Sequence, residues 1–85
     1  MRLHVGNLSW KATEDDVRQA FEVYGTVERV ILPPSNIREG ENRGFAIVRM
    51  SDLEGSVALE HAGGAVIRGR AIHVEEAPPQ RFKER

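Results

Sequence analysis

The sequence contains no cysteine, and this absence excludes two classes of protein at once. Without thiols, the chain can form neither disulfide bonds nor thiolate metal sites. It also lacks an apolar run near the roughly 20 residues that a membrane-spanning helix needs. Its N-terminus does not show the basic and then apolar pattern of a secretory signal. The sequence therefore predicts a cytoplasmic protein with no membrane partner.

Aromatic residues are scarce, at 6% of the 85 residues, and the net charge is only −1. A chain of this length predicts one domain with a single modest core. The small net charge hides a segregation, because the predicted helices at 13–24 and 51–62 hold seven acids and one arginine. The rest of the chain then carries +5, and local field steers a charged ligand more than net charge does. Acids also favour the first turn of any helix, so this asymmetry has a purely structural explanation as well.

The most informative stretch is Arg43-Gly44-Phe45-Ala46-Ile47-Val48-Arg49-Met50. Side chains alternate between the two faces of a strand, so Ala46 and Val48 are expected to point toward a core. The opposite face would carry Arg43, Phe45, Ile47 and Arg49. An aromatic ring beside arginines suits a stacked base next to a phosphate. A buried strand with charged ends fits the same octet.

The predicted elements alternate as βαββαβ, with strands at 2–5, 27–32, 43–50 and 71–75 and the two helices between them. Thr13 with Asp16, and Ser51 with Glu54, match the capping box that begins a helix. Glycines at the ends of both helices, Gly25 and Gly63-Gly64, indicate where each one stops. Residues 65–70 are expected to form a hairpin-like approach to the last strand.

For two residues near the helices we have more specific expectations. Gly55 lies inside the second predicted helix, where glycine costs about 1 kcal/mol relative to alanine. This cost indicates that the helix lies very close to the sheet at that position. Trp10, just before the first helix, is expected to cover the packing edge of that helix.

This order of elements predicts an α+β fold of the ferredoxin-like sandwich type. Right-handed crossovers place both helices on one face of a four-stranded antiparallel sheet. The other face stays open, and an open face with apolar and cationic side chains is typical of a binding surface. It would carry His4, Arg29, Ile31, Arg43, Phe45, Ile47, Arg49, His73 and Glu75.

Two segments resemble the signatures of the RNA recognition motif family. The octet at 43–50 resembles the longer signature, [K/R]-G-[F/Y]-[G/A]-F-V-x-[F/Y]. Leu3-His4-Val5-Gly6-Asn7-Leu8 resembles the shorter signature on the first strand. The resemblance covers residues 2–77, which indicates one such domain at 1–77 and a short basic C-terminal tail at 78–85. A chain of this kind looks like the small single-domain RNA-binding proteins of bacteria.

The resemblance implies that single-stranded RNA, or single-stranded DNA, lies across the sheet with bases stacked on aromatic side chains. Phe45 would contact a base or sugar and Arg43 a phosphate. The path between them would be lined by Arg49, Arg29, His73 and Glu75.

The chain also departs from the family pattern. His4 stands where the family usually has Phe or Tyr, Ile47 where a second stacking ring is usual, and Met50 where an aromatic is usual. One missing ring forfeits on the order of 1–3 kcal/mol, so weak to moderate affinity is expected.

Other functional classes fit less well or stay open. A member of this family with few rings could bind a protein partner through either face. An acylphosphatase-like hydrolase would need a glycine-rich anion loop with an arginine, and no catalytic set converges on the open face, so neither an enzyme nor a cofactor is expected. His4 and His73 could face each other over a metal, but no third ligand is placed. The tail, with Arg81, Phe82, Lys83 and Arg85, either adds charge and a ring or is a frayed terminus.

Overall fold

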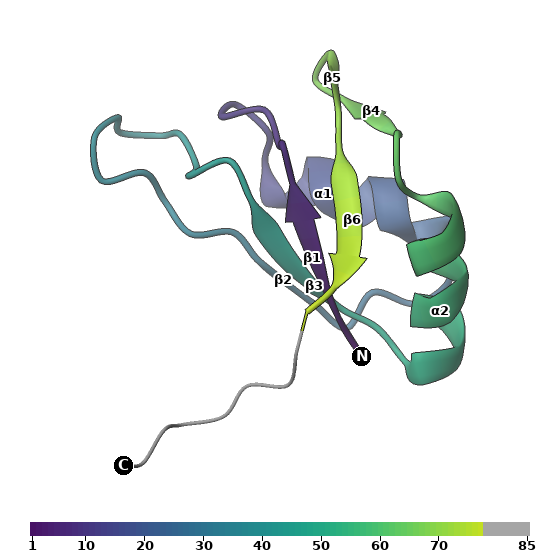
Figure 1. The fold of residues 1–85 in the computed structure, drawn as a ribbon. Helices are drawn as coiled ribbons and strands as arrows, with labels where there is room; N and C mark the ends of the chain where they lie inside the picture. Colours follow the sequence, from purple (N-terminus) through teal and green to yellow (C-terminus); the bar gives the residue numbers. More distant parts are fainter. Residues whose placement is uncertain (78–85) are drawn as a thin grey trace, which may run out of the picture.

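The structure, a computed structural model, describes residues 1–77. Within these residues an antiparallel sheet of order β2-β3-β1-β6 packs against two helices (Figure 1). The predicted α+β sandwich is therefore confirmed. The bounds are β1 Arg2–Gly6, α1 Glu14–Glu22, β2 Arg29–Ile31, β3 Ala46–Arg49, α2 Asp52–His61, β4 Val66–Ile67, β5 Arg70–Ala71 and β6 His73–Glu76.

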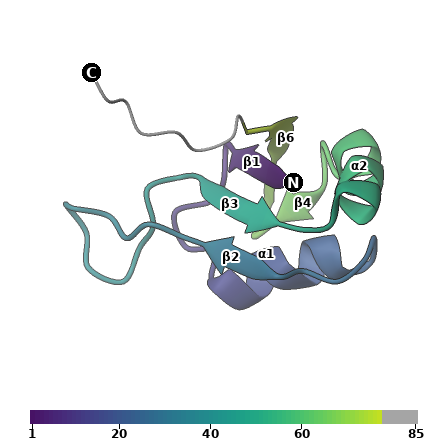
Figure 2. The ribbon, with the colours of Figure 1, turned by 90° about the horizontal axis from the view of Figure 1, so that it is seen from below.

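Both helices lie on the same side of the four-stranded sheet (Figure 2). The core between the layers follows the predicted alternation, since Leu3 and Val5 of β1 are fully buried, as is Val48 of β3. Val17 and Phe21 supply the buried side of α1. The opposite face of the sheet is left uncovered by the helices. No helix among the described residues is long and apolar enough to cross a membrane.

The strand β3 is shorter than predicted and begins at Ala46 instead of Arg43. Ile31 pairs with Ile47, and the next bridge joins Pro34 to Asn42. Four residues, 43–46, thus lie opposite two, 32–33, which is a bulge in the ladder. Gly44 lies within this bulge at a φ of 93°, a conformation that glycine adopts without a steric penalty. The prediction that Arg43 belongs to this strand was wrong.

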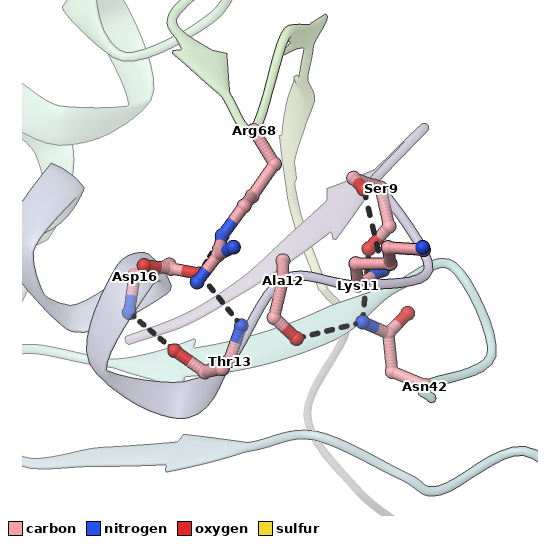
Figure 3. Close-up of polar contacts among 7 residues, drawn as sticks. All are labelled: Ser9, Lys11, Ala12, Thr13, Asp16, Asn42 and Arg68. Atoms are coloured by element: carbon pink, nitrogen blue, oxygen red, sulfur yellow. Dashed lines mark hydrogen bonds and ion pairs between the residues drawn. The ribbon is translucent and has the colours of Figure 1, made fainter. Parts of the chain in front are cut away.

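The N-terminus of α1 has the predicted capping box (Figure 3). The Asp16 N–H donates to Thr13 Oγ1 at 3.1 Å, and the Thr13 N–H donates to Asp16 Oδ2 at 2.9 Å. Arg68, from the β4–β5 turn, donates to the same carboxylate oxygen at 2.7 Å. The helix start is therefore also joined to a turn 52 residues later in the chain.

Only half of the second predicted capping box forms. Ser51 Oγ accepts the Glu54 N–H at 3.1 Å, but the Glu54 carboxylate accepts the backbone N–H of Thr26 at 2.9 Å. A Cβ on Gly25 would collide with the Glu54 side chain. The glycine after α1 thus leaves room for a bond between α2 and the turn that leads into β2.

The close approach predicted at Gly55 is confirmed. A Cβ there would lie 2.7 Å from the sulfur of Met1, which immediately precedes β1. The predicted hairpin also forms, from β4 and β5, with Arg68 and Gly69 at positive φ in its turn. The last predicted strand, 71–75, is divided because Ala71 belongs to this hairpin and the sheet strand β6 begins at His73.

Candidate nucleic-acid interface

The register of the sheet places the predicted open-face residues in rows that cross the strands. The middle row contains Ile31, Ile47, His4 and Glu75, each directly opposite its neighbour in the row. Ile31, Ile47 and His4 are partly buried, and Glu75 is exposed. The structure therefore brings together residues that are far apart in the sequence. Apolar side chains occupy the centre of this face, and a carboxylate lies at its β6 edge.

A second row, toward the start of β1, consists of arginines. Arg29 pairs with Arg49, and Arg49 pairs with Arg2 on its other side. Adjacent strands lie about 4.8 Å apart, and like charges directly opposite one another are destabilising. A row of this kind attracts a polyanion. Arg2 was not among the residues predicted for the open face, although the alternation of Leu3 and Val5 already places it on the face of His4.

The third row is built on the ring of Phe45. One step beyond the Val5–Ala46 pair lie Gly6 and Phe45, and Gly6 pairs with His73 on β6. The rings of His4 and Phe45 stack, with centroids 5.5 Å apart and planes inclined by 14°. A Cβ on Gly6 would lie 3.4 Å from His4 Cε1, so this glycine leaves space for the imidazole. His4 therefore joins Phe45 in one continuous aromatic surface.

Arg43 lies at the base of the β2–β3 loop and not beside Phe45 on the strand. Its Nε–H donates to the Pro34 carbonyl at 3.0 Å, and an Nη2–H donates to Asn36 Oδ1 at 2.9 Å. The bulge at Gly44 explains the difference, because it interrupts the alternation on which the prediction depended. Arg43 is exposed, and its remaining N–H groups stay available for a phosphate.

Met50 faces the core, where only 1% of its surface is exposed. The replacement of an aromatic at this position therefore removes nothing from the open face. Of the three departures from the family pattern, only those at His4 and Ile47 lie on the open face. His4 keeps a flat ring there, and Ile47 does not.

Trp10 contacts the β2–β3 loop. It was predicted to cover the packing edge of α1 instead. Its side chain is 51% exposed, and the guanidinium of Arg38 lies over the indole at 4.8 Å from the ring centroid. A Cβ on Gly44 would lie 3.5 Å from Trp10 Nε1. The tryptophan therefore belongs to the end of the molecule where the β1–α1 and β2–β3 loops meet.

Asn42 joins these two loops. Its side-chain amide donates to the carbonyls of Ser9 and Ala12 at 2.9 and 3.0 Å (Figure 3). Its Oδ1 accepts the Gly44 N–H at 2.6 Å, and the residue is 4% exposed. A buried amide with its donors and acceptor all satisfied fixes the geometry around it. The base of the β2–β3 loop is thus held against the loop that carries Trp10.

The helical side is acidic, as predicted. With the observed bounds, α1 has four acids and Arg18, and α2 has three acids, so the two helices together still carry −6. Within residues 1–77 no three side chains of the metal-binding types are grouped as a metal site. His4 and His73 both border Gly6, but among those residues they are not part of any group of three side chains that could hold a metal ion. The predicted basic tail lies outside the described residues.

Comparisons with known sequences agree on one family. The family model of the RNA recognition motif matches residues 3–73. A protein of Nostoc sp. named "Putative RNA-binding protein RbpF" is 43% identical over 81 residues, which cover 94% of this chain and 76% of that protein. RbpA of Synechocystis sp., which carries the same description, is 40% identical and is matched over 94% of this chain and 79% of its own length.

Solved structures give the same result. The crystal structure of RNA binding protein PG1 superposes with a TM-score of 0.82 at 28% identity, covering 96% of this chain and 99% of that one. The solution structure of the N-terminal RNA binding domain of a hypothetical protein gives 0.82 at 30% identity. That comparison covers 94% of this chain and 81% of the other.

Proposed function

Because the chain belongs to the RNA recognition motif family, we propose that it binds single-stranded RNA across the open face of its sheet. The observation that carries this proposal is the stacked pair of His4 and Phe45. The two rings offer a flat aromatic surface on the uncovered side of β1 and β3. Bases stack on such surfaces with little regard to sequence, since every base has a flat π face.

For each remaining open-face residue, the proposed role follows from the row of paired residues in which it lies. Ile31 and Ile47 form an apolar floor beside the rings. His73 and Glu75, exposed on β6, offer hydrogen-bonding groups to base edges. The phosphates of the strand are expected to contact the cationic side chains, which are Arg2, Arg29, Arg43 and Arg49.

The affinity of the sheet alone is expected to be weak to moderate. Ile47 occupies the position between Ile31 and His4 where a second full aromatic ring would extend the stack. Each base–aromatic stack is worth about 1–3 kcal/mol, or roughly 5- to 150-fold in affinity. Binding thus depends on one phenyl ring, one imidazole and the arginines.

Fluorescence anisotropy tests the proposal directly. End-labelled single-stranded RNA of random sequence, its DNA counterpart and duplex RNA are titrated with the protein at two salt concentrations. We expect single-stranded RNA to bind most tightly and its affinity to fall with salt, because phosphate contacts release counterions. Equal binding of duplex RNA, or no binding of single strands, would reject the open face as a single-strand site.

Several narrower points rest on the sequence alone and remain proposals. A protein partner is the alternative occupant of this surface, and single-stranded DNA is an alternative ligand. We propose a cytoplasmic, non-catalytic binding protein. The contribution of the tail at 78–85 is tested by deleting residues 80–85, which should lower the RNA affinity and its salt dependence if the tail touches phosphates.

A further inference from the structure

A single carboxylate interrupts the cationic and apolar character of the open face. Within residues 1–77, Glu75 of the edge strand β6 is the only acid among the strand residues on this face. The residue is exposed, and no hydrogen bond or ion pair joins it to another residue of that part of the chain. Both oxygens of its carboxylate are therefore available to a ligand.

The charge of Glu75 is unfavourable for a ligand that is only a polyanion. The same face carries a row of three arginines, and a carboxylate near them repels the phosphates that they attract. Charges on an edge strand also discourage pairing with other chains. Glu76, the next residue of β6, is exposed as well and pairs with Leu3, so it supplies that protection from the helical side. The presence of Glu75 on the open face is explained if the ligand brings hydrogen-bond donors to it.

Glu75 lies beside the aromatic surface. It is directly opposite His4, and the Cβ atoms of such a pair are about 4.5–5.5 Å apart. The ring of His4 in turn stacks on Phe45. Gly6, the next residue of β1 on this face, has no side chain to block the path toward β6. A base that stacks on the two rings can therefore direct one of its edges at the Glu75 carboxylate.

The four RNA bases differ in what their exposed edges offer to a carboxylate, which only accepts hydrogen bonds. Guanine has two adjacent donors, N1–H and the N2 amine, which match the two carboxylate oxygens. Adenine and cytosine each place a ring-nitrogen acceptor beside their single amine, and uracil has a carbonyl on both sides of its N3–H. Hydrogen bonds to an ionised acceptor are also roughly twice as strong as neutral ones. A carboxylate at this position therefore favours guanine over the other three bases.

We propose that Glu75 selects guanine for the position stacked on His4, by accepting hydrogen bonds from N1–H and from the N2 amine. This inference rests on the proposed function, because the base must first stack on the sheet. The rings accept any base, and the carboxylate distinguishes one base from the others. The protein thus gains a preference for single-stranded RNA that contains guanosine.

Anisotropy titrations with matched oligonucleotides test this preference. Labelled uridine oligonucleotides of equal length carry guanosine, inosine, adenosine, cytidine or uridine at one central position. The guanosine oligonucleotide should bind roughly tenfold more tightly than those with adenosine, cytidine or uridine, which is within the range for a bidentate base contact. Inosine is guanosine without the N2 amine, so the inosine oligonucleotide should lose most of this gain.

Two substitutions at neighbouring positions separate base recognition from charge. Glu75→Gln replaces one of the two acceptor oxygens with a donor and should abolish the preference for guanosine. Glu76→Gln removes the same charge from the helical side of the same strand and should keep the preference. Either change also reduces the repulsion of phosphates, so the quantity to compare is the ratio of the guanosine affinity to the uridine affinity.

The outcomes distinguish this inference from the proposed function. Equal affinities for all the oligonucleotides, with binding that still depends on Phe45, would overturn the selection by Glu75 and leave the sheet site standing. A guanosine preference that survives Glu75→Gln, or that inosine retains in full, would do the same. If no oligonucleotide binds and Phe45→Ala makes no difference, both proposals are rejected together.

Discussion

Arg49 of β3 lies directly opposite Arg2 of β1 on the open face of the sheet. Arg29 occupies the corresponding position on the other side of Arg49, so the middle arginine has a like charge on each flank. This arrangement costs folding free energy and is therefore expected to contribute to binding an anion.

Replacing the middle arginine with a neutral residue tests whether the arginine row both destabilises the fold and contributes to anion binding. Arg49→Gln should weaken RNA binding and reduce the slope of log K against log salt by about 0.7, the value for one phosphate contact on a single strand. The free energy of unfolding should stay the same or rise by a few tenths of a kcal/mol, since a like-charge contact is removed. Arg68→Gln removes the same charge from the β4–β5 turn and should leave the salt slope unchanged. An unaltered slope in Arg49→Gln would exclude a phosphate contact there.

Phe45→Ala tests the aromatic surface. The substitution should weaken single-stranded RNA binding by about 1–3 kcal/mol and barely change stability, because the ring lies on the uncovered side of the sheet. Phe21→Ala is the reverse control, since that ring is fully buried and its loss should cost roughly 3–5 kcal/mol of unfolding free energy. Anisotropy titration and urea denaturation of both variants provide the measurements. Wild-type affinity in Phe45→Ala would remove the stacking role.

Ile47→Phe should strengthen RNA binding. The new ring would stand directly opposite His4 and beside Phe45, extending the stack toward β2. A gain of about 1–2 kcal/mol is expected from one further base contact, read from the dissociation constant for a uridine oligonucleotide. Weaker or unchanged binding would indicate that the aliphatic surface of Ile31 and Ile47 serves an apolar protein partner instead.

The lowered pKa of Asp16 predicts that the stability of the protein depends on pH. Its bond from the Thr13 N–H, and then its bond from Arg68, hold the pKa of this carboxyl below its ordinary value of 3.8. Because the pKa is lower in the folded state, the stabilisation is present above about pH 4 and is lost as the pH falls through the folded-state pKa. Asp16→Asn should therefore lower the unfolding free energy at pH 7 by about 0.5–1 kcal/mol, an estimate for a partly exposed cap.

The measurement for Asp16 is urea denaturation at pH 7 and pH 2.5. The gap between wild type and Asp16→Asn should narrow at the lower pH, because the wild-type carboxyl loses its charge as the pH falls through its lowered folded-state pKa. Asp15→Asn, one residue earlier and exposed, should show no such convergence. A gap of the same size at both pH values would mean that the charge of Asp16 adds nothing beyond its hydrogen bond.

The features that the sequence predicted correctly depend on neighbours in the chain. The alternation around Ala46 and Val48 reports which face is buried, and the Thr13–Asp16 capping box needs only four residues. The predicted open face likewise included His4 and Phe45, whose rings stack on each other there. These features required no knowledge of which strands pair.

The features that were missed depend on contacts across the fold. Glycine is compatible with an extended strand and with positive φ, so Gly44 did not reveal the bulge that moves Arg43 into the loop. Trp10 is held by residues about 30 positions later, through Asn42, and no local pattern indicates that partnership. The row of three arginines became visible only when the register placed Arg2 beside Arg49.

The strict alternation of β3 has a consequence for how this protein can diverge. Ala46 and Val48 are fully buried, whereas Ile47 and Arg49 point away from them onto the open face. Substitutions at Ile47 and Arg49 therefore change the proposed binding surface and leave the buried side of the strand as it is. Within one strand, the proposed binding surface and the core are thus made of separate residues, so a substitution can change the first without disturbing the second.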